Sequence, residues 1–380
     1  MIHNHPRGGV RQRNRPVRLP VPARPTRRSR PRVVGAWATA LDGGMPDSML
    51  AGRLNVRTRE FAVKEVPVPS PGPGEVLIQV AAAGICLSDV HLIEGQLSPL
   101  FLAGDEVTLG HEVAGTVAVL GDGVTGLAEG QRVLLQAGEE KDGWIHTRGV
   151  DYDGGWAQYA LATAETVVPI PDSLPFEQAC IVPDAVSTPW ASIVRTAQVR
   201  AAQPVGVWGI GGLGAHAVQL LRLAGAAPIV AVDPVPAARQ RAVDFGADLA
   251  LDPSEDIATR VRELTGGAGL AFAFDFAGVA PVREQAVRCL ERDGALVLVG
   301  LTDQPLEIRN GTQFSYFGQR ILGHYGSEPA HVVELVDLVR HHRLDLSRSI
   351  SGTLPLTEAA DGVHRLANKE GDPIRLVITP

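Results

Sequence analysis

The pattern of hydrophobic and polar positions changes about halfway along the chain. From Met49 to about Ala185, short apolar runs alternate with Gly- and Pro-containing turns such as Pro71-Gly72-Pro73-Gly74. Such runs, bounded by turn residues, are typical of strands joined by short connections. The first half is therefore predicted to be an antiparallel β domain, with strands at 75–81, 112–120, 131–136 and 156–161.

From about Val186, buried strands alternate with amphipathic helices. One such helix, 237–245, stops at Gly246. This alternation favours a doubly wound parallel sheet, with an α/β fold for the whole chain. Strands are expected at 205–208, 229–232, 249–251, 271–274 and 295–299.

The last segment should return to the first domain, because two helices (331–341 and 359–366) there precede a final strand at 374–378. We therefore expect a leader at 1–48, a β domain at 49–185, a parallel-sheet domain at 186–326 and a return segment at 327–380.

The leader differs in composition from the remainder. Residues 1–34 contain ten Arg, no Asp or Glu, and no helical or strand periodicity. A segment that buries so little apolar surface is predicted to be disordered. Two other interpretations stay open: a twin-arginine export signal at Arg27-Arg28, and an over-long reading frame with Met45 or Met49 as the true start.

Charge and cysteine content limit the class of function. Without residues 1–34, 25 basic residues face 42 acidic ones, a net charge of −17, which argues against a nucleic-acid partner. No apolar run approaches the roughly 18 residues that a membrane span needs. Three dispersed cysteines cannot form a disulfide framework, so a reducing, cytoplasmic location is expected.

A glycine-rich turn indicates dinucleotide binding. It runs from Gly209 to Gly214, between the strand at 205–208 and the helix at 213–223, and its glycines are Gly209, Gly211, Gly212 and Gly214. Glycine allows the tight turn and the close approach of a pyrophosphate, which the helix N-terminus then stabilises. A plain structural turn is the alternative.

Asp233 ends the next strand, 24 residues after Gly209. Such a carboxylate accepts hydrogen bonds from the adenosine ribose and repels a 2′-phosphate, so NAD is expected rather than NADP. Arg239 and Arg241 follow it. They either soften that preference or form a solvated helix face.

Polar residues interrupt the apolar first domain at 84–91 and 110–112. Together with the glycine turn and Asp233, these segments resemble the zinc-containing alcohol dehydrogenase branch of the medium-chain dehydrogenase/reductase superfamily. The resemblance covers Met49 to the C-terminus. It implies a GroES-like catalytic domain, a Rossmann NAD-binding domain, and hydride transfer between an alcohol or carbonyl substrate and NAD.

The resemblance also implies a zinc site. Cys86 and His111 match two ligands of the catalytic zinc, and Asp184 stands where many relatives have a cysteine ligand. A thiolate, an imidazole and a carboxylate suit tetrahedral Zn²⁺ with one open position. Each residue alone has a structural alternative: a buried thiol, a core histidine and a helix cap. Cys180 is a rival ligand, and Cys289 is expected in the core.

Other site residues follow from the same resemblance. Asp89 and Glu112 match acids that orient the ligands, and Ser88 matches the hydroxyl that binds the substrate oxygen. His91 matches a proton-relay imidazole, with an ordinary surface histidine as the alternative. Thr188 would border the nicotinamide, and Arg375 would contact the cofactor pyrophosphate.

One departure from the family pattern bears on metal content. Relatives often hold a second, structural zinc with four closely spaced cysteines, but the stretch 136–155 has none. One zinc per chain is therefore expected. The shortened lobe puts the usual oligomer contacts in doubt, although a homodimer or homotetramer is still expected.

Two competing functions remain. A zinc-free quinone or enoyl reductase on the same scaffold would not need Cys86, His111 and Asp184, and a catalytically silent NAD-binding protein would not need Ser88 and His91. The sequence does not determine the substrate. Three bulky residues either line its pocket or pack in the core: Leu92, Trp156 and Trp190.

Overall fold

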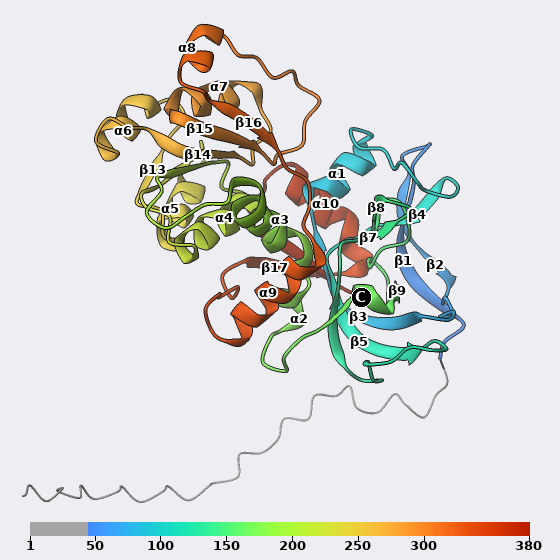
Figure 1. The fold of residues 1–380 in the computed structure, drawn as a ribbon. Coiled ribbons are helices and arrows are strands. Elements are labelled where there is room, and N and C mark those ends of the chain that lie inside the picture. The colour runs from blue at the N-terminus through green and yellow to red at the C-terminus, as the bar shows by residue number, and fades with distance from the viewer. Residues whose placement is uncertain (1–44) are drawn as a thin grey trace, which may run out of the picture. The chain divides into compact units, whose positions relative to one another are not determined.

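The computed structural model describes residues 45–380 of the 380-residue chain, so the predictions for the leader lie outside the described residues. Residues Pro46–Pro380 form one compact unit, drawn in colour in Figure 1. It contains two large sheets, one mostly antiparallel and one parallel.

The parallel sheet has six strands in the order β13-β12-β11-β14-β15-β16. All neighbouring pairs are parallel. The strands are β11 (Val205–Trp208), β12 (Ile229–Val232), β13 (Leu249–Leu251), β14 (Leu270–Asp275), β15 (Leu290–Leu298) and β16 (Arg320–Gly323). The order reverses between β11 and β14, which makes the carboxyl ends of these strands a crevice for a ligand.

Helices cover this sheet on both faces. α4 packs on α5, and α6 packs on α7 (Figure 1). The helices are α4 (Gly212–Leu223), α5 (Pro236–Phe245), α6 (Ile257–Leu264), α7 (Ala280–Cys289) and the short α8 (Gly311–Tyr316). As expected, α5 ends at Gly246, whose φ of 111° is left-handed. The doubly wound prediction is confirmed.

The second large sheet is built mainly from the first part of the chain. Its order is β10-β6-β5-β3-β18-β17, with β9 also paired to β3. The strands are β3 (Glu75–Ile85), β5 (Val113–Leu120), β6 (Arg132–Leu135), β9 (Tyr159–Thr163), β10 (Val167–Pro169), β17 (Ile350–Pro355) and β18 (Arg375–Thr379). The expected strand at 156–161 begins three residues later, because Trp156 belongs to the preceding loop.

Two smaller sheets complete the β structure. One has the order β2-β1-β4, and the other is an isolated hairpin. Their strands are β1 (Ser48–Asn55), β2 (Phe61–Pro67), β4 (Glu106–Thr108), β7 (Gly138–Lys141) and β8 (Trp144–Thr147). The hairpin β7–β8 occupies the stretch in which the sequence has no cysteines.

The end of the chain joins the mostly antiparallel sheet. Leu376 in β18 lies opposite Ile85 in β3, and the two strands are antiparallel. Only β17 and β18 pair in parallel within this sheet. The return places Arg375 next to the end of β3, where the first polar segment begins.

The remaining elements are short apart from two helices near the C-terminus. These elements are α1 (Leu87–Glu94), α2 (Phe176–Ala179), α3 (Ser187–Ala191), α9 (Pro329–Arg340), α10 (Ala359–Ala367), η1 (Ala164–Thr166), η2 (Val182–Val186), η3 (Ser192–Ala197) and η4 (Leu356–Glu358). Among residues 45–380, no helix has the length and apolarity required to cross a membrane.

The largest apolar cluster connects the two sheets. It combines Val205 and Val207 of the parallel sheet with Ala82, Leu134 and Val377 of the other. Burial of this shared surface stabilises both sheets as one unit. The parallel sheet and the mostly antiparallel sheet therefore share one packed interior.

Candidate metal centre and cofactor cleft

Cys86 lies where β3 ends and α1 begins. It is the N-cap residue of α1, and its backbone N–H donates to Asp89 Oδ2 at 2.8 Å. Helix starts leave such donors unpaired unless a side chain accepts them. Asp89 thus fixes the position of Cys86, whose side chain is 3% exposed.

His111 follows a glycine in a tight loop before β5. Gly110 has a φ of 95°, a left-handed conformation that glycine adopts without strain. The imidazole is buried, with Nδ1 3.6 Å from Asp89 Oδ1 and Nε2 3.3 Å from Asp184 Oδ2. Asp89 therefore contacts the backbone of Cys86 and faces the ring of His111.

Asp184 lies in η2, a turn of π-helix. Such turns are frequent at functional sites because they shift a side chain out of the regular helical register. Thr188 Oγ1 donates to Asp184 Oδ1 at 2.9 Å, which leaves Oδ2 facing Cys86 and His111. The helix-cap interpretation of Asp184 is wrong, because the N-cap of this turn is Ile181.

These three side chains converge although they are far apart in the sequence. Cys86 Sγ lies 3.4 Å from Asp184 Oδ2, and the three candidate ligand atoms all lie within 4.8 Å of one another. Ligands held at zinc-ligand distances in a tetrahedron are separated by about 3.3–3.8 Å. The observed separations of 3.3 and 3.4 Å fit one shared ion.

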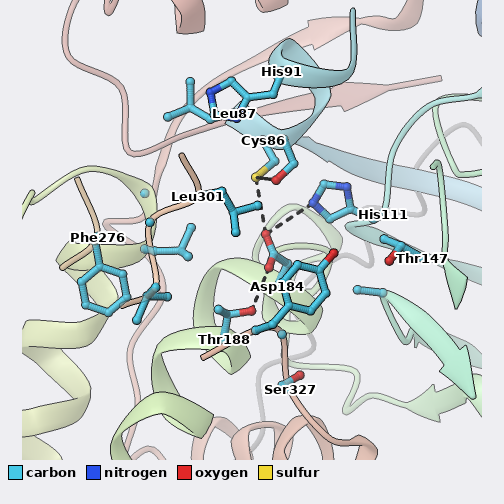
Figure 2. Close-up of a pocket in the computed structure, with 18 of the residues that line it drawn as sticks. Cys86, Leu87, His91, His111, Thr147, Asp184, Thr188, Phe276, Leu301 and Ser327 are labelled. Carbon is cyan, nitrogen blue, oxygen red and sulfur yellow. Dashed lines mark hydrogen bonds and ion pairs between the residues drawn. The ribbon is translucent and has the colours of Figure 1, made fainter. Parts of the chain in front are cut away.

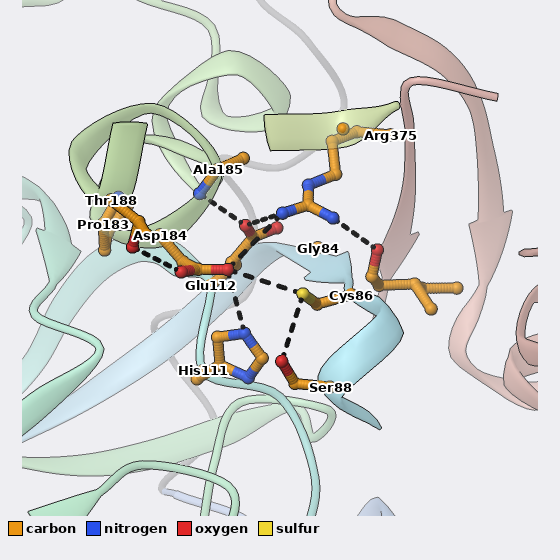
Figure 3. Close-up of polar contacts among 12 residues, drawn as sticks. Gly84, Cys86, Ser88, His111, Glu112, Pro183, Asp184, Ala185, Thr188 and Arg375 are labelled. Atoms are coloured by element: carbon orange, nitrogen blue, oxygen red, sulfur yellow. Dashed lines mark hydrogen bonds and ion pairs between the residues drawn. The ribbon is translucent and has the colours of Figure 1, made fainter. Parts of the chain in front are cut away.

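Glu112 and Arg375 form a buried ion pair behind this cluster (Figure 3). Arg375 Nη2 donates to Glu112 Oε1 at 2.9 Å and lies 3.4 Å from Asp184 Oδ2. Glu112 Oε1 also accepts the backbone N–H of Ala185 at 3.0 Å. Arg375 thus lies among the acids of the cluster, and its contact with a pyrophosphate stays a prediction.

The electrostatics of the cluster suit a cation. Burial raises the pKa of Glu112 to about 7, against the lowering effect of Arg375. Burial also works against a charged His111, but the carboxylates of Asp89 and Asp184 raise its pKa well above the usual value. Both shifts favour the protonated forms of Glu112 and His111, which reduces the net negative charge of the cluster. A divalent metal would supply this positive charge instead.

Unpaired polar atoms point to the same conclusion. Among the described residues, His111 Nδ1, Asp89 Oδ1 and Glu112 Oε2 are buried without a hydrogen-bond partner. Metal-ligating histidines usually donate their second ring nitrogen to a carboxylate. Binding through Nε2 would orient the Nδ1–H of His111 towards Asp89, so the donor set fits zinc.

The glycine turn joins β11 to α4 as expected. Gly209 has a φ of 88°, and a Cβ on Gly214 would lie 1.8 Å from the carbonyl oxygen of Gly209. A Cβ on Gly211 would meet nothing within 4 Å. The turn is therefore closely packed against the protein at Gly214 and open towards the cleft at Gly211, as a phosphate site requires.

Asp233 is fixed by the backbone around it. Its Oδ2 accepts the N–H of Ile210 in the glycine turn at 2.7 Å, and its Oδ1 accepts the N–H of Val235 at 2.8 Å. The side chain is 8% exposed and lines the cleft. Asp233 thus couples the end of β12 to the turn that it adjoins.

The two nearby arginines are bound within the protein. Arg239 donates to Asp252 Oδ2 at 2.9 Å and to the carbonyl oxygen of Asp233 at 2.7 Å. Arg241 donates to the carbonyl oxygen of Ile210 and to Asp372, and its side chain is only 11% exposed. The solvated-face interpretation is therefore wrong for Arg241.

A cleft of about 1500 Å³ joins the metal cluster to the glycine turn. Ser88, His91 and Thr188 line it, as do all four glycines of the turn and Asp233. Figure 2 shows Leu87, Thr147 and Leu301 around Cys86 and Asp184. Neither Thr147 nor Leu301 was predicted from the sequence, because neither belongs to a motif.

The three bulky candidates for the substrate pocket do not line this cleft. Trp156 and Leu92 are fully buried, and the indole N–H of Trp190 donates to Glu334 at 2.8 Å. Cys180 and Cys289 are buried too, and burial raises the pKa of both thiols. Cys289 packs in the core as expected, and Cys180 lies outside the group that can share an ion.

Comparison with known proteins places this architecture in a family. Residues 72–172 match the alcohol dehydrogenase GroES-like domain, and residues 212–341 match the zinc-binding dehydrogenase domain. The chain is 32% identical over 368 residues to the NDMA-dependent alcohol dehydrogenase of Amycolatopsis methanolica, covering 86% of this chain and 98% of the relative. The chain belongs to the zinc-containing alcohol dehydrogenase family.

Solved structures of similar proteins share this fold. Acetophenone reductase from Geotrichum candidum NBRC 4597, in complex with NAD, has a TM-score of 0.79 at 26% identity, covering 89% of this chain and 99% of that one. A Sinorhizobium meliloti 1021 protein bound to NADP has a TM-score of 0.81 at 26% identity, covering 88% and 100%. The chain is an alcohol dehydrogenase-like oxidoreductase with a GroES-like sheet and a Rossmann-like sheet.

Proposed function

We propose that this chain is a zinc- and NAD-dependent dehydrogenase that transfers a hydride between an alcohol-type carbon and nicotinamide. The observation that carries the proposal is the convergence of Cys86, His111 and Asp184 within 4.8 Å, in a cleft that also contains the glycine turn. A metal site and a dinucleotide site in one cleft favour a dehydrogenase over a binding protein.

Cys86, His111 and Asp184 would hold the single zinc ion through Sγ, Nε2 and Oδ2. Asp89 and Thr188 orient the ligands from behind. When bound, zinc supplies Lewis acidity that favours deprotonation of an alcohol oxygen near neutral pH. We expect no second ion at the hairpin β7–β8, because that stretch contains no cysteine.

Ser88 and His91 would move the proton that an alcohol loses on oxidation. Ser88 Oγ lies 3.6 Å from Cys86 Sγ, and both Ser88 and His91 line the cleft. The hydroxyl of Ser88 would accept this proton and pass it toward the cofactor ribose and the imidazole of His91, which carries it to solvent. The reverse order supplies the proton when a carbonyl is reduced.

The cofactor would lie along the carboxyl ends of β11 and β12. Backbone N–H groups at the start of α4 would bind its pyrophosphate, near Arg375, and Thr188 would border the nicotinamide. The carboxylate of Asp233 would bind the ribose and disfavour the 2′-phosphate of NADP. We propose NAD as the cofactor for this reason.

The wider assignments are also proposals. Residues 49–185 and 327–380 would form the catalytic domain, and residues 186–326 would form the cofactor domain. The three cysteines are unpaired, which supports a reducing, cytoplasmic environment. A homodimer or homotetramer acting on a small alcohol or carbonyl substrate completes the proposal.

Metal analysis and one substitution test this function. The purified protein should contain about one zinc per chain, and two would contradict the proposal of a single site. His111→Ala should remove most of the metal and lower turnover by more than about a hundredfold, while NAD still binds. Elemental analysis, NADH absorbance with a panel of alcohols, and NADH fluorescence measure the three quantities.

His331→Ala is the matched control, because His331 is also buried but lies in α9, outside the metal cluster. It should keep the zinc. Full turnover in His111→Ala would point to the zinc-free reductase. Zinc and NAD binding without turnover of any substrate in the panel would point to the silent binding protein.

A further inference from the structure

Trp156 contacts the two segments that lead to the first two candidate metal ligands, although it lies outside the cleft: the end of β3 before Cys86 and the loop before His111. Its side chain is fully buried and is one of the largest fully buried side chains among the described residues. Its indole N–H donates to the carbonyl oxygen of Gly84 at 3.0 Å. Gly84 precedes Cys86 by two residues, so this bond fixes the end of β3 just before the thiol.

The same edge of the indole lies against the backbone of Gly110, the residue before His111. A Cβ on Gly110 would lie 2.2 Å from Cδ1 of Trp156, so the backbone next to His111 touches the indole directly. The backbone N–H of Trp156 also donates to the carbonyl oxygen of Leu109 at 2.9 Å. Trp156 is thus in contact both with the end of β3 and with the loop before His111.

The end of β3 and the segment that carries His111 also contact each other at this point. The N–H of Gly84 donates to the carbonyl oxygen of Glu112 at 2.8 Å. The backbone of Gly84 is therefore held at its N–H by Glu112, which follows His111, and at its carbonyl oxygen by the indole. Phe61 packs edge-on against Trp156 with ring centroids 5.8 Å apart, which keeps the indole in this orientation.

We propose that Trp156 is a positioning residue for the metal site, which sets the separation of Cys86 and His111 through the backbone of Gly84 and Gly110. This inference rests on the proposed zinc site. A metal bound by groups from several loops depends on how rigidly those groups are held. The acids Asp89 and Glu112 contact the side chains or neighbouring groups of the ligands directly. Trp156 differs from them, since it contacts only the backbone near the ligands, at Gly84 and Gly110.

The substitution Trp156→Phe tests the proposal, because it removes the N–H donor and part of the contact with Gly110 while keeping an aromatic ring. We expect zinc to dissociate at least about tenfold faster, as for other residues that support metal ligands indirectly. The release rate is measured on the zinc-loaded protein with a chromogenic chelator. A cobalt(II) derivative should show an altered thiolate charge-transfer band.

Trp208→Phe is a matched control. Trp208 is also fully buried, and its indole N–H donates to Gln285 Oε1 at the same distance of 3.0 Å, but it lies in the parallel sheet. Both variants should lose thermal stability, whereas only Trp156→Phe should release zinc faster. Equal release rates in the two variants would overturn the proposal and leave Trp156 as core packing.

A second variant covers the possibility that Trp156→Phe does not fold. Replacement of Trp156 by 3-benzothienylalanine through codon suppression keeps the bicyclic shape and removes only the donor. Faster zinc release would support the proposal, and unchanged release would overturn it. The unsubstituted protein is measured first: if it binds no zinc, the proposed function itself fails, which is a different result from a normal zinc site that ignores Trp156.

Discussion

Asp233 has two tasks at the edge of the cofactor cleft. Its two carboxylate oxygens accept backbone N–H groups from Ile210 and Val235. Each oxygen has further capacity to accept, so these bonds leave room for a ribose hydroxyl. Asp233 thus holds the glycine turn through Ile210 and also serves the proposed selection of the cofactor.

Replacing Asp233 by Ser should weaken the discrimination between NAD and NADP. The ratio of kcat/KM for the two cofactors should fall by at least about tenfold, because the charge that repels a 2′-phosphate is lost. Asp233→Asn is the control for shape, since it removes the charge but retains an acceptor for the N–H of Ile210. An unchanged ratio in both variants would mean that another residue selects the cofactor.

At the scale of elements, the glycine turn and α4 act together. Gly214 allows the first turn of α4 to lie against the carbonyl oxygen of Gly209, whereas Gly211 faces open space. The two glycines therefore serve different purposes. Gly214 allows the packing of the helix, and Gly211 leaves access for the pyrophosphate.

Two alanine substitutions should separate these purposes. Gly214→Ala should lower the free energy of unfolding by about 2 kcal/mol or more and weaken NAD binding, because its Cβ collides with the backbone. Gly211→Ala should leave thermal stability unchanged and weaken NAD binding at least about tenfold. Thermal unfolding without cofactor and NADH fluorescence titration measure the two effects, and equal unfolding losses would contradict this division.

At the scale of the whole molecule, α4 is tied to the segment that returns to the mostly antiparallel sheet. His216 in α4 is fully buried, with Nδ1 2.6 Å from the carbonyl oxygen of Gly212 and Nε2 2.8 Å from Ser349 Oγ. The carbonyl can only accept, so Nδ1 carries the proton and a neutral Nε2 accepts from Ser349. Burial, with a smaller effect of Arg375, lowers the pKa of His216 to about 4.

This histidine should make the fold sensitive to acid. Its pKa is about 6.5 in the unfolded chain and about 4 in the folded one, so between these values the unfolded state binds more protons. Stability from this group is present above pH 6.5 and falls as the pH falls. From pH 7 to pH 5 its contribution to the free energy of unfolding should drop by about 2 kcal/mol.

His216→Gln is the comparison variant, because it lacks the titrating group and retains a polar atom near Ser349. The unfolding free energies of both proteins are measured by denaturant titration at pH 7 and pH 5. The original protein should lose about 2 kcal/mol more than the variant over this interval. Equal losses would show that His216 does not titrate as its surroundings indicate.

The sequence by itself determined what depends on neighbouring residues. The apolar runs at 205–208, 229–232 and 249–251 coincide with β11, β12 and β13, because short, continuously buried strands have a strong local pattern. The strand β16 was not predicted, since its four residues are partly exposed and resemble a loop. The glycine turn was also readable, because its backbone requirements are local.

Only the tertiary structure decided what depends on residues far apart in the sequence. Family motifs suggested Cys86, His111 and Asp184 as ligands. The distances of Asp184 Oδ2 from Cys86 Sγ (3.4 Å) and from His111 Nε2 (3.3 Å) arise from the packing of α1, the loop before β5 and η2. The contact of Arg375 with a pyrophosphate stays a prediction, whereas its pairing with Glu112, which follows from the pairing of β18 with β3, was not predicted. Trp156 was a candidate for either the pocket or the core, and it is fully buried against the end of β3 and the loop before His111. Side-chain partners of this kind are set by the folded chain, because no local pattern encodes contacts between residues so far apart in the sequence.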